Sequence, residues 1–226
     1  MTQPTFLENA MSIDIELQKK IVEELTWDPS IDATHITVAV KDSIATLSGY
    51  VPRFADKENA EQATKRVANV KAVVDEVEVK LAGSFKRTDL EIAEMALKAL
   101  QANSTLPKDK VKVTVADGWV TLDGEVEWHY QQDSAASSVR YLSGVKGVTN
   151  KMTIKPTVHI SDIKSKIRDA LVRNAQIDAN NINVGVNGGM AVLDGKVKSW
   201  AEKEQAGYAA WSAPGVTSVQ NNISIR

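Results

Sequence analysis

Histidines are the side chains with which this chain could most readily bind a metal or move a proton, and it has three. They are His35, His129 and His159, and none has a partner at the spacing of a metal-binding motif such as H-E-x-x-H. No serine lies in a strand–turn–helix nucleophile motif, and the chain has no cysteine to supply a thiolate. The sequence therefore predicts no catalytic residue, no bound metal, no cofactor and no enzyme activity.

A second candidate for chemistry is a polar position that recurs three times: Asp75, Asn150 and Asn221. The period of two along a strand places Asp75 on the same side as the apolar Val73 and Val77. A polar group that faces inward needs partners, and backbone groups beside a helix-to-strand turn would provide them. The alternative is a cation site formed by side-chain and carbonyl oxygens at this position, with or without Asp123 or Asp194, because hard cations prefer oxygen ligands.

Three glycines also recur inside alternating segments: Gly49, Gly124 and Gly195. A glycine weakens a strand, and it is usually kept where a bulge forms or another backbone comes close. No phosphate-loop spacing surrounds these glycines, so we expect a structural role. Small residues three apart, such as Ala60 and Ala63, follow on a predicted helix, and we predict a close helix-to-strand contact at each glycine.

These recurrences arise from a triplicated unit. A shift of 75 residues places Gly49 on Gly124, and a further shift of 71 places Gly124 on Gly195, with no gap in either step. The same shifts superpose many apolar residues, which indicates three tandem domains at 14–81, 89–156 and 160–226. Residues 82–88, AGSFKRT, form a predicted flexible linker, whereas the join near Pro156 to His159 is shorter.

Each copy has the same predicted order of elements, namely helix, strand, strand, helix and strand. The first helix is predicted from apolar residues spaced along one face, which in the first copy are Ile15, Leu17, Ile21, Val22 and Leu25. Thr88 and Ser161 are predicted caps of this helix in the second and third copies. HITVAV, KVKVTV and NINVGV alternate as half-buried strands do. We predict an α+β fold in which two helices cover one face of a three-stranded mixed sheet.

A unit of this length and order, with an apolar-x-Gly strand and a closing V-x-x-V-x-N-x-I pattern, resembles the BON domain, named for bacterial osmotic-stress and nodulation proteins. GVTNKMTI (147–154) and GVTSVQNNISI (215–225) carry the closing pattern, and the first copy departs from it at Asp75. The resemblance implies a non-enzymatic module of envelope or osmotic-stress proteins associated with phospholipid surfaces. It favours a non-catalytic, stress-associated binding or scaffold protein; the alternative is a cytoplasmic cation-binding or sensing protein.

Differences between the copies indicate candidate contact residues. Trp211 stands where the other copies carry Lys65 and Arg140, and Tyr208 also replaces polar residues. Trp27 is a further aromatic that only one copy has at its position. Such aromatics either pack between neighbouring copies or contact a protein partner or a membrane.

Charge changes sign along the chain. The first copy has 9 basic and 13 acidic residues (−4), the second 8 and 9 (−1) and the third 8 and 6 (+2). We therefore expect any contact with anionic lipid to use Tyr208 or Trp211 with basic residues of the third copy's first helix: Lys164, Lys166, Arg168 and Arg173. The alternative is an ordinary solvated helix face. The chain has no basic stripe with interleaved aromatics, which predicts no specific nucleic-acid binding.

The composition, 43% apolar and 25% charged, is typical of a folded globular protein. No apolar run approaches the roughly 20 residues that span a bilayer, so we expect no transmembrane segment. The opening MTQPTFLENAMSIDIELQ does not resemble a secretory signal, which predicts a cytoplasmic location, or a periplasmic one if the native chain begins elsewhere. No feature of the sequence specifies the oligomeric state.

Overall fold

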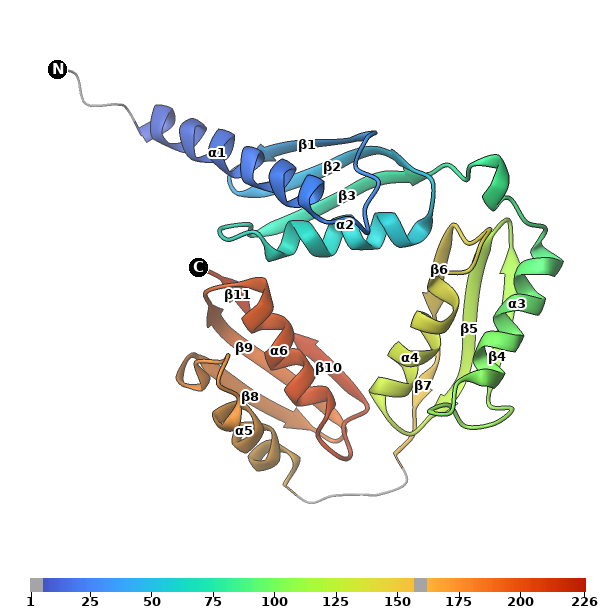
Figure 1. The fold of residues 1–226 in the computed structure, drawn as a ribbon. Helices are drawn as coiled ribbons and strands as arrows, with labels where there is room; N and C mark the ends of the chain where they lie inside the picture. The colour runs from blue at the N-terminus through green and yellow to red at the C-terminus, as the bar shows by residue number, and fades with distance from the viewer. Residues whose placement is uncertain (1–5, 157–161) are drawn as a thin grey trace. The chain divides into compact units, whose positions relative to one another are not determined.

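The computed structural model describes residues 6–156 and 162–226. The chain divides into two compact units, one that ends at Ala82 and one that runs from Gly83 to Arg226. The same small α+β fold occurs once in the first unit and twice in the second (Figure 1). The predicted fold class and its threefold repetition are therefore confirmed. The join after Pro156, with His159 and Ser161, lies outside the described residues.

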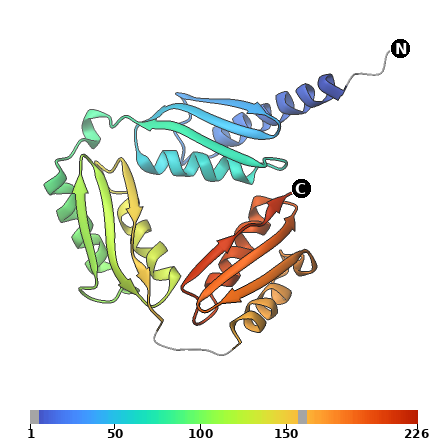
Figure 2. The same ribbon diagram turned by 180° about the vertical axis from the view of Figure 1, so that it is seen from behind.

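In the first copy the elements are α1 (Phe6–Trp27), β1 (Ile36–Lys41), β2 (Ile44–Val51), α2 (Phe54–Arg66) and β3 (Ala72–Val79). The central strand is β2, which pairs antiparallel with β1 and parallel with β3. Helix α1 contacts β1, α2 contacts β2 and β3, and the two helices contact each other. Both helices therefore cover the same face of the sheet, as Figures 1 and 2 show from opposite sides.

The second copy has a short 3₁₀ turn, η1 (Gly83–Phe85), within the predicted linker, followed by α3 (Asp89–Ala102), β4 (Val111–Ala116), β5 (Trp119–Val126), α4 (His129–Arg140), β6 (Gly147–Asn150) and β7 (Thr153–Ile154). The third has α5 (Ile163–Arg173), η2 (Ala179–Asn181), β8 (Ile182–Asn187), β9 (Met190–Val197), α6 (Trp200–Trp211), β10 (Ser218–Asn221) and β11 (Ser224–Ile225). The last strand of both copies is thus interrupted by two residues, and both of its pieces pair in parallel with the central strand.

In the second and third copies a side chain caps the start of the first helix. The Thr88 side chain accepts a hydrogen bond from the Glu91 amide, and the Glu91 side chain accepts one from the Thr88 amide, which confirms the predicted cap. In the third copy the cap is Asp162, whose side chain accepts from the Ser165 amide.

The buried face of α1 is narrower than predicted. Leu17, Ile21 and Leu25 are buried in the core, whereas Ile15 and Val22 are exposed. The prediction that all five residues face the sheet was therefore wrong for these two. The reason is geometric, because two helices share a three-stranded sheet and each covers it with only one stripe of side chains.

A carboxylate ties the hairpin turn to the first helix in two of the copies. Both oxygens of Asp14 accept hydrogen bonds, from the amides of Asp42 and Ser43 at 2.8 and 3.1 Å. Asp89 does the same for the turn between β4 and β5. This contact fixes the hairpin against the helix that packs beside it.

Candidate functional site

The three recurrent glycines lie opposite the backbone that enters the first strand of each copy. Their φ angles are positive, at 109° for Gly49, 141° for Gly124 and 147° for Gly195. A Cβ added there would lie 2.0, 2.1 and 2.0 Å from a backbone carbonyl oxygen, that of His35, Lys110 and Asn181 respectively. The close neighbour is thus strand backbone, and the expectation that the second helix makes this contact was wrong. Because glycine has no Cβ, the backbone that enters the first strand can approach the second strand closely at the end of the hairpin away from the turn.

The recurrent asparagine joins the second helix to the last strand in the second and third copies. Asn150 Nδ2 donates to the carbonyl of Gln132 at 3.0 Å, and its Oδ1 accepts from the Met152 amide at 3.1 Å. Asn221 makes the equivalent pair of bonds, to the carbonyl of Lys203 and from the amide of Ile223. The Oδ1 bond satisfies the amide of the second residue that interrupts the last strand, and the Nδ2 bond ties the strand to a carbonyl of the second helix.

In the first copy a lysine replaces the missing amide donor. Asp75 Oδ1 still accepts from the Val77 amide at 3.0 Å, but a carboxylate cannot donate to the helix. Lys57, which occupies the position of Gln132 and Lys203, places its Nζ 3.4 Å from Asp75 Oδ2 and donates to the Val77 carbonyl. The change from asparagine to aspartate is therefore matched by a change on the helix.

The structure places Asp123 and Asp194, the two optional ligands of the cation alternative, away from the recurrent asparagines. Asn150 pairs in register with Leu122, and Asn221 with Leu193, so the neighbouring Asp123 and Asp194 point to the opposite face of the sheet. Asp194 instead accepts a hydrogen bond from Asn222 at 3.0 Å. Within residues 6–156 and 162–226, no group of three or more His, Cys, Asp or Glu side chains could hold a metal ion.

A buried polar position at the start of the second helix was not predicted from the sequence. It is Asp56, Gln131 and Glu202, which are 0%, 9% and 8% exposed. Glu202 accepts from the Asp178 and Lys198 amides at 2.9 and 2.8 Å, which joins the loop before β8 to the start of α6. The same 75- and 71-residue shifts superpose these three positions, and that is the signal that could have found them.

The other two copies fill this position differently. Gln131 accepts from the Trp128 amide at 3.1 Å and donates to the Thr105 carbonyl at 3.0 Å, so it also ties the two loops together. Asp56 pairs with Arg53 at 2.5 Å. A polar group in each copy thus holds the loop that precedes the second helix.

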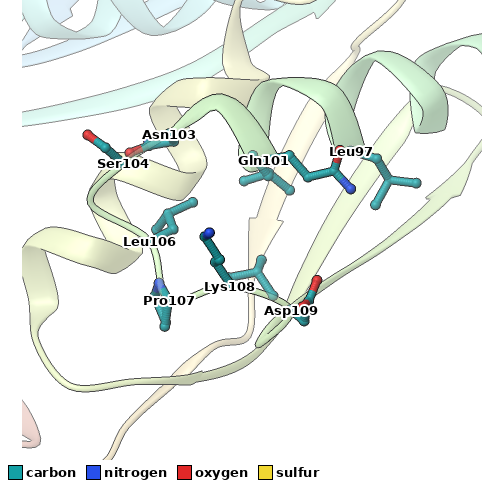
Figure 3. A pocket seen from close by; sticks show the side chains of 10 residues that line it. Leu97, Gln101, Asn103, Ser104, Leu106, Pro107, Lys108 and Asp109 are labelled. Atoms are coloured by element: carbon teal, nitrogen blue, oxygen red, sulfur yellow. The ribbon is translucent and has the colours of Figure 1, made fainter.

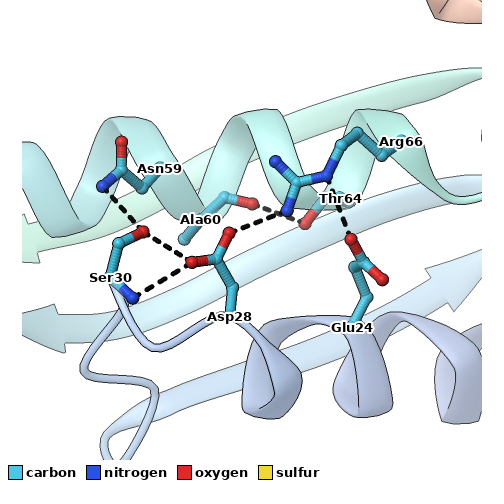
Figure 4. A network of polar contacts seen from close by, with 7 residues as sticks. All are labelled: Glu24, Asp28, Ser30, Asn59, Ala60, Thr64 and Arg66. Carbon is cyan, nitrogen blue, oxygen red and sulfur yellow. Dashed lines mark hydrogen bonds and ion pairs between the residues drawn. The ribbon is translucent and has the colours of Figure 1, made fainter.

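A polar network links the ends of α1 and α2 in the first copy (Figure 4). Arg66 donates to Asp28 at 2.8 Å and to Glu24 at 3.0 Å, and the Ser30 hydroxyl donates to Asp28 at 2.6 Å. Hydrogen bonds from Ser30 and Arg66 lower the pKa of Asp28 to about 2. Asn59 of α2 donates to the Ser30 hydroxyl. The second and third copies lack this carboxylate–guanidinium contact at the equivalent positions, because Arg66 is replaced there by Tyr141 and Ser212.

The four basic candidates of the third copy lie on two flanks of α5. Lys166 and Arg173 line a cavity of about 270 Å³ together with Asp169 and Ala170 of the same helix and with residues of α6 and the turn that follows it: Ala209, Ser212, Ala213 and Pro214. Lys164 and Arg168, four residues apart, lie on the other side of the helix and do not line this cavity. The structure therefore divides the predicted patch into two pairs.

The aromatic candidates differ in exposure. Tyr208 is exposed and lies one turn before Ser212, on the side of α6 that lines the cavity. Trp211 is half-buried, packs against the third copy's core and stacks on the His129 ring at 4.0 Å between centroids. Of the two aromatic residues, Tyr208 is the more exposed.

A larger cavity, of about 470 Å³, lies in the second copy where α3 ends (Figure 3). Its apolar lining comes from α3 and from the loop that leads to β4, and consists of Leu97, Leu100, Leu106, Pro107 and Val111. The polar residues of its lining are Gln101, Asn103, Ser104, Lys108 and Asp109. None of the residues singled out in the sequence lines this cavity.

The family model of the BON domain matches residues 14–80, 88–156 and 159–226. Osmotically-inducible protein Y of Escherichia coli (strain K12) is 34% identical over 146 residues, which cover 63% of this chain and 73% of that protein. A solved structure of CdsD, a structural protein of the type III secretion system of Chlamydia trachomatis, is 18% identical over 93% of this chain and 92% of its own, with a TM-score of 0.26. No described helix is long and apolar enough to cross a membrane.

Proposed function

We propose that this chain, which belongs to the BON domain family along nearly its whole length, is a non-catalytic, stress-associated binding or scaffold protein that contacts anionic phospholipid through its third copy. The similarity to a protein named for its osmotic induction supports an association with osmotic stress. The test of this association is the amount of the protein in its native cells before and after an osmotic upshift. We expect the amount to rise, and an unchanged amount would contradict the association.

One observation supports the proposed lipid contact. Lys166 and Arg173 stand beside a cavity between the two helices of the only copy with a positive net charge, where Asp169 offsets part of their charge, and the exposed Tyr208 lies one turn from the cavity residue Ser212. A basic residue near an anionic surface contributes about 1 kcal/mol, so these two give weak binding that salt screens. A tyrosine at the interface adds apolar contact while its hydroxyl stays hydrated.

The test is co-sedimentation of the full chain with vesicles of anionic or neutral phospholipid at low and high salt. We expect binding to anionic vesicles at low salt only. The variant Lys166→Glu/Arg173→Glu should lose it, whereas Lys164→Glu/Arg168→Glu, an equal change of charge on the other flank of α5, should retain most of it. An equal loss in the two variants, or no binding to anionic vesicles at low salt, would contradict the proposed surface.

A further inference from the structure

The first helices of the first two copies carry the same exposed apolar stripe. On α1 it consists of Ile15 and Val22, which are 60% and 45% exposed, and on α3 of Leu90 and Leu97, which are 70% and 46% exposed. The 75-residue shift superposes the two pairs, and residues seven apart lie on one side of a helix. In the third copy Arg168 stands where Val22 and Leu97 stand, so the stripe is confined to the first two copies.

The charged residues within the two stripes have opposite signs. Midway between the apolar pair, α1 has Lys19 and α3 has Glu94, and both are exposed. Beside Val22 and Leu97 the sign is exchanged as well, with Glu23 on α1 and Lys98 on α3, whereas beside Ile15 and Leu90 both helices carry an exposed glutamate, Glu16 and Glu91. If α1 packed on another α1, Lys19 would face Lys19, and two α3 helices would bring Glu94 against Glu94. Pairing α1 with α3 places Lys19 beside Glu94 whether the helices run parallel or antiparallel, because both residues lie at the centre of the stripe.

The stripe of α3 continues into the 470 Å³ cavity at the end of the helix, since Leu97 belongs to both (Figure 3). Helix α1 ends in Trp27, which is 85% exposed. In a parallel pair with Ile15 beside Leu90, Trp27 comes level with Ala102, the last residue of α3. At 3.6 residues per turn Trp27 lies about 120° around α1 from Ile15, so the stripe and not this tryptophan forms the contact.

We propose that α1 of one molecule docks on α3 of a second copy of this chain, with Ile15 and Val22 against Leu90 and Leu97 and with Lys19 beside Glu94. Because α1 and α3 are different surfaces, the interface is heterologous and joins molecules head to tail, in a ring or an open chain. The interface uses the first two copies, whereas the lipid contact uses the third. It therefore does not depend on the proposed function.

The test is sedimentation velocity of the full chain over a range of concentrations, with charge-reversed variants. The wild type should associate as its concentration rises. Lys19→Glu and Glu94→Lys should each raise the dissociation constant by about tenfold or more, because each places like charges at the centre of the interface. An equimolar mixture of the two variants should associate as the wild type does, because each α1 then meets an α3 of opposite charge on the other variant.

Lys20→Glu is the matched control, since it makes the same change of charge one residue along α1, away from the stripe, at another exposed position. It should associate as the wild type does. The double variant Leu90→Gln/Leu97→Gln should remain monomeric, and far-UV circular dichroism checks that every variant is folded. A wild type that stays monomeric at all concentrations, or a mixture that associates no better than its components, would overturn the proposal.

Discussion

Replacement of Gly195 by alanine should lower the free energy of unfolding of the third copy by about 2–4 kcal/mol. Two effects add. The φ angle of 147° is one that residues with a Cβ rarely adopt, which costs about 1–3 kcal/mol. The new methyl group would also lie 2.0 Å from the carbonyl oxygen of Asn181, so the backbone that enters β8 must move away from β9.

Gly185→Ala, in the paired strand β8, is the matched control. A Cβ there lies 3.8 Å from the nearest atom, in the Val192 side chain, and its backbone is not at positive φ, so this change should be neutral or stabilise by roughly 0.5–1 kcal/mol. Native-state hydrogen exchange of the full chain is the appropriate assay, because three linked domains need not unfold in one step. In the Gly195→Ala variant, β9 amides should exchange about 30- to 1,000-fold faster. Equal effects of the two substitutions would refute the reasoning.

Three further predictions concern the polar contacts. Asn150→Asp should destabilise by about 1–2 kcal/mol, because a carboxylate cannot donate to the Gln132 carbonyl, and an added Gln132→Lys should restore part of the loss by recreating the first copy's lysine pair. Urea unfolding of both variants tests this, and an additive double variant would contradict it. Because the pKa of Asp28 falls from 3.8 to about 2 on folding, the stability that it contributes is present above about pH 4 and is lost toward pH 2. Acid titrations should show that Asp28→Asn removes this component, and an unchanged titration would contradict it. Thr88→Ala should cost about 1 kcal/mol, measured by faster amide exchange in α3, and Thr88→Ser should not.

The fold could be predicted from the sequence because each copy repeats the same strand alternation around the same glycine. The prediction was wrong where the spacing of apolar residues places them on one side of a helix but does not indicate which of them pack against the sheet. Ile15 and Val22 extend the helical spacing of Leu17 and Ile21, yet only the latter two face the sheet. Similarly, the glycine correctly indicated a close approach, but the partner is a carbonyl that only the hairpin register brings opposite it.

The buried polar position could not be predicted from residue type, because its three members are of different types: Asp56, Gln131 and Glu202. They also lie at a helix start, where polar residues are normally exposed caps. Their burial depends on loops about 25 residues away, such as the one that contains Asp178. The basic surface of the third copy illustrates the same limit. Charge counting identified the copy, but only the packing of α5 against α6 separates the pair at the cavity from the pair on the other flank.

The most direct test of the lipid contact is residue-resolved NMR of the full chain, titrated at low salt with nanodiscs of anionic phospholipid. Amide signals of Lys166, Arg173 and Ser212 should shift or broaden first, while those of the acidic first copy stay unchanged, and added salt should reverse the effect. Changes that begin in the first copy, or none at any lipid concentration, would contradict the account.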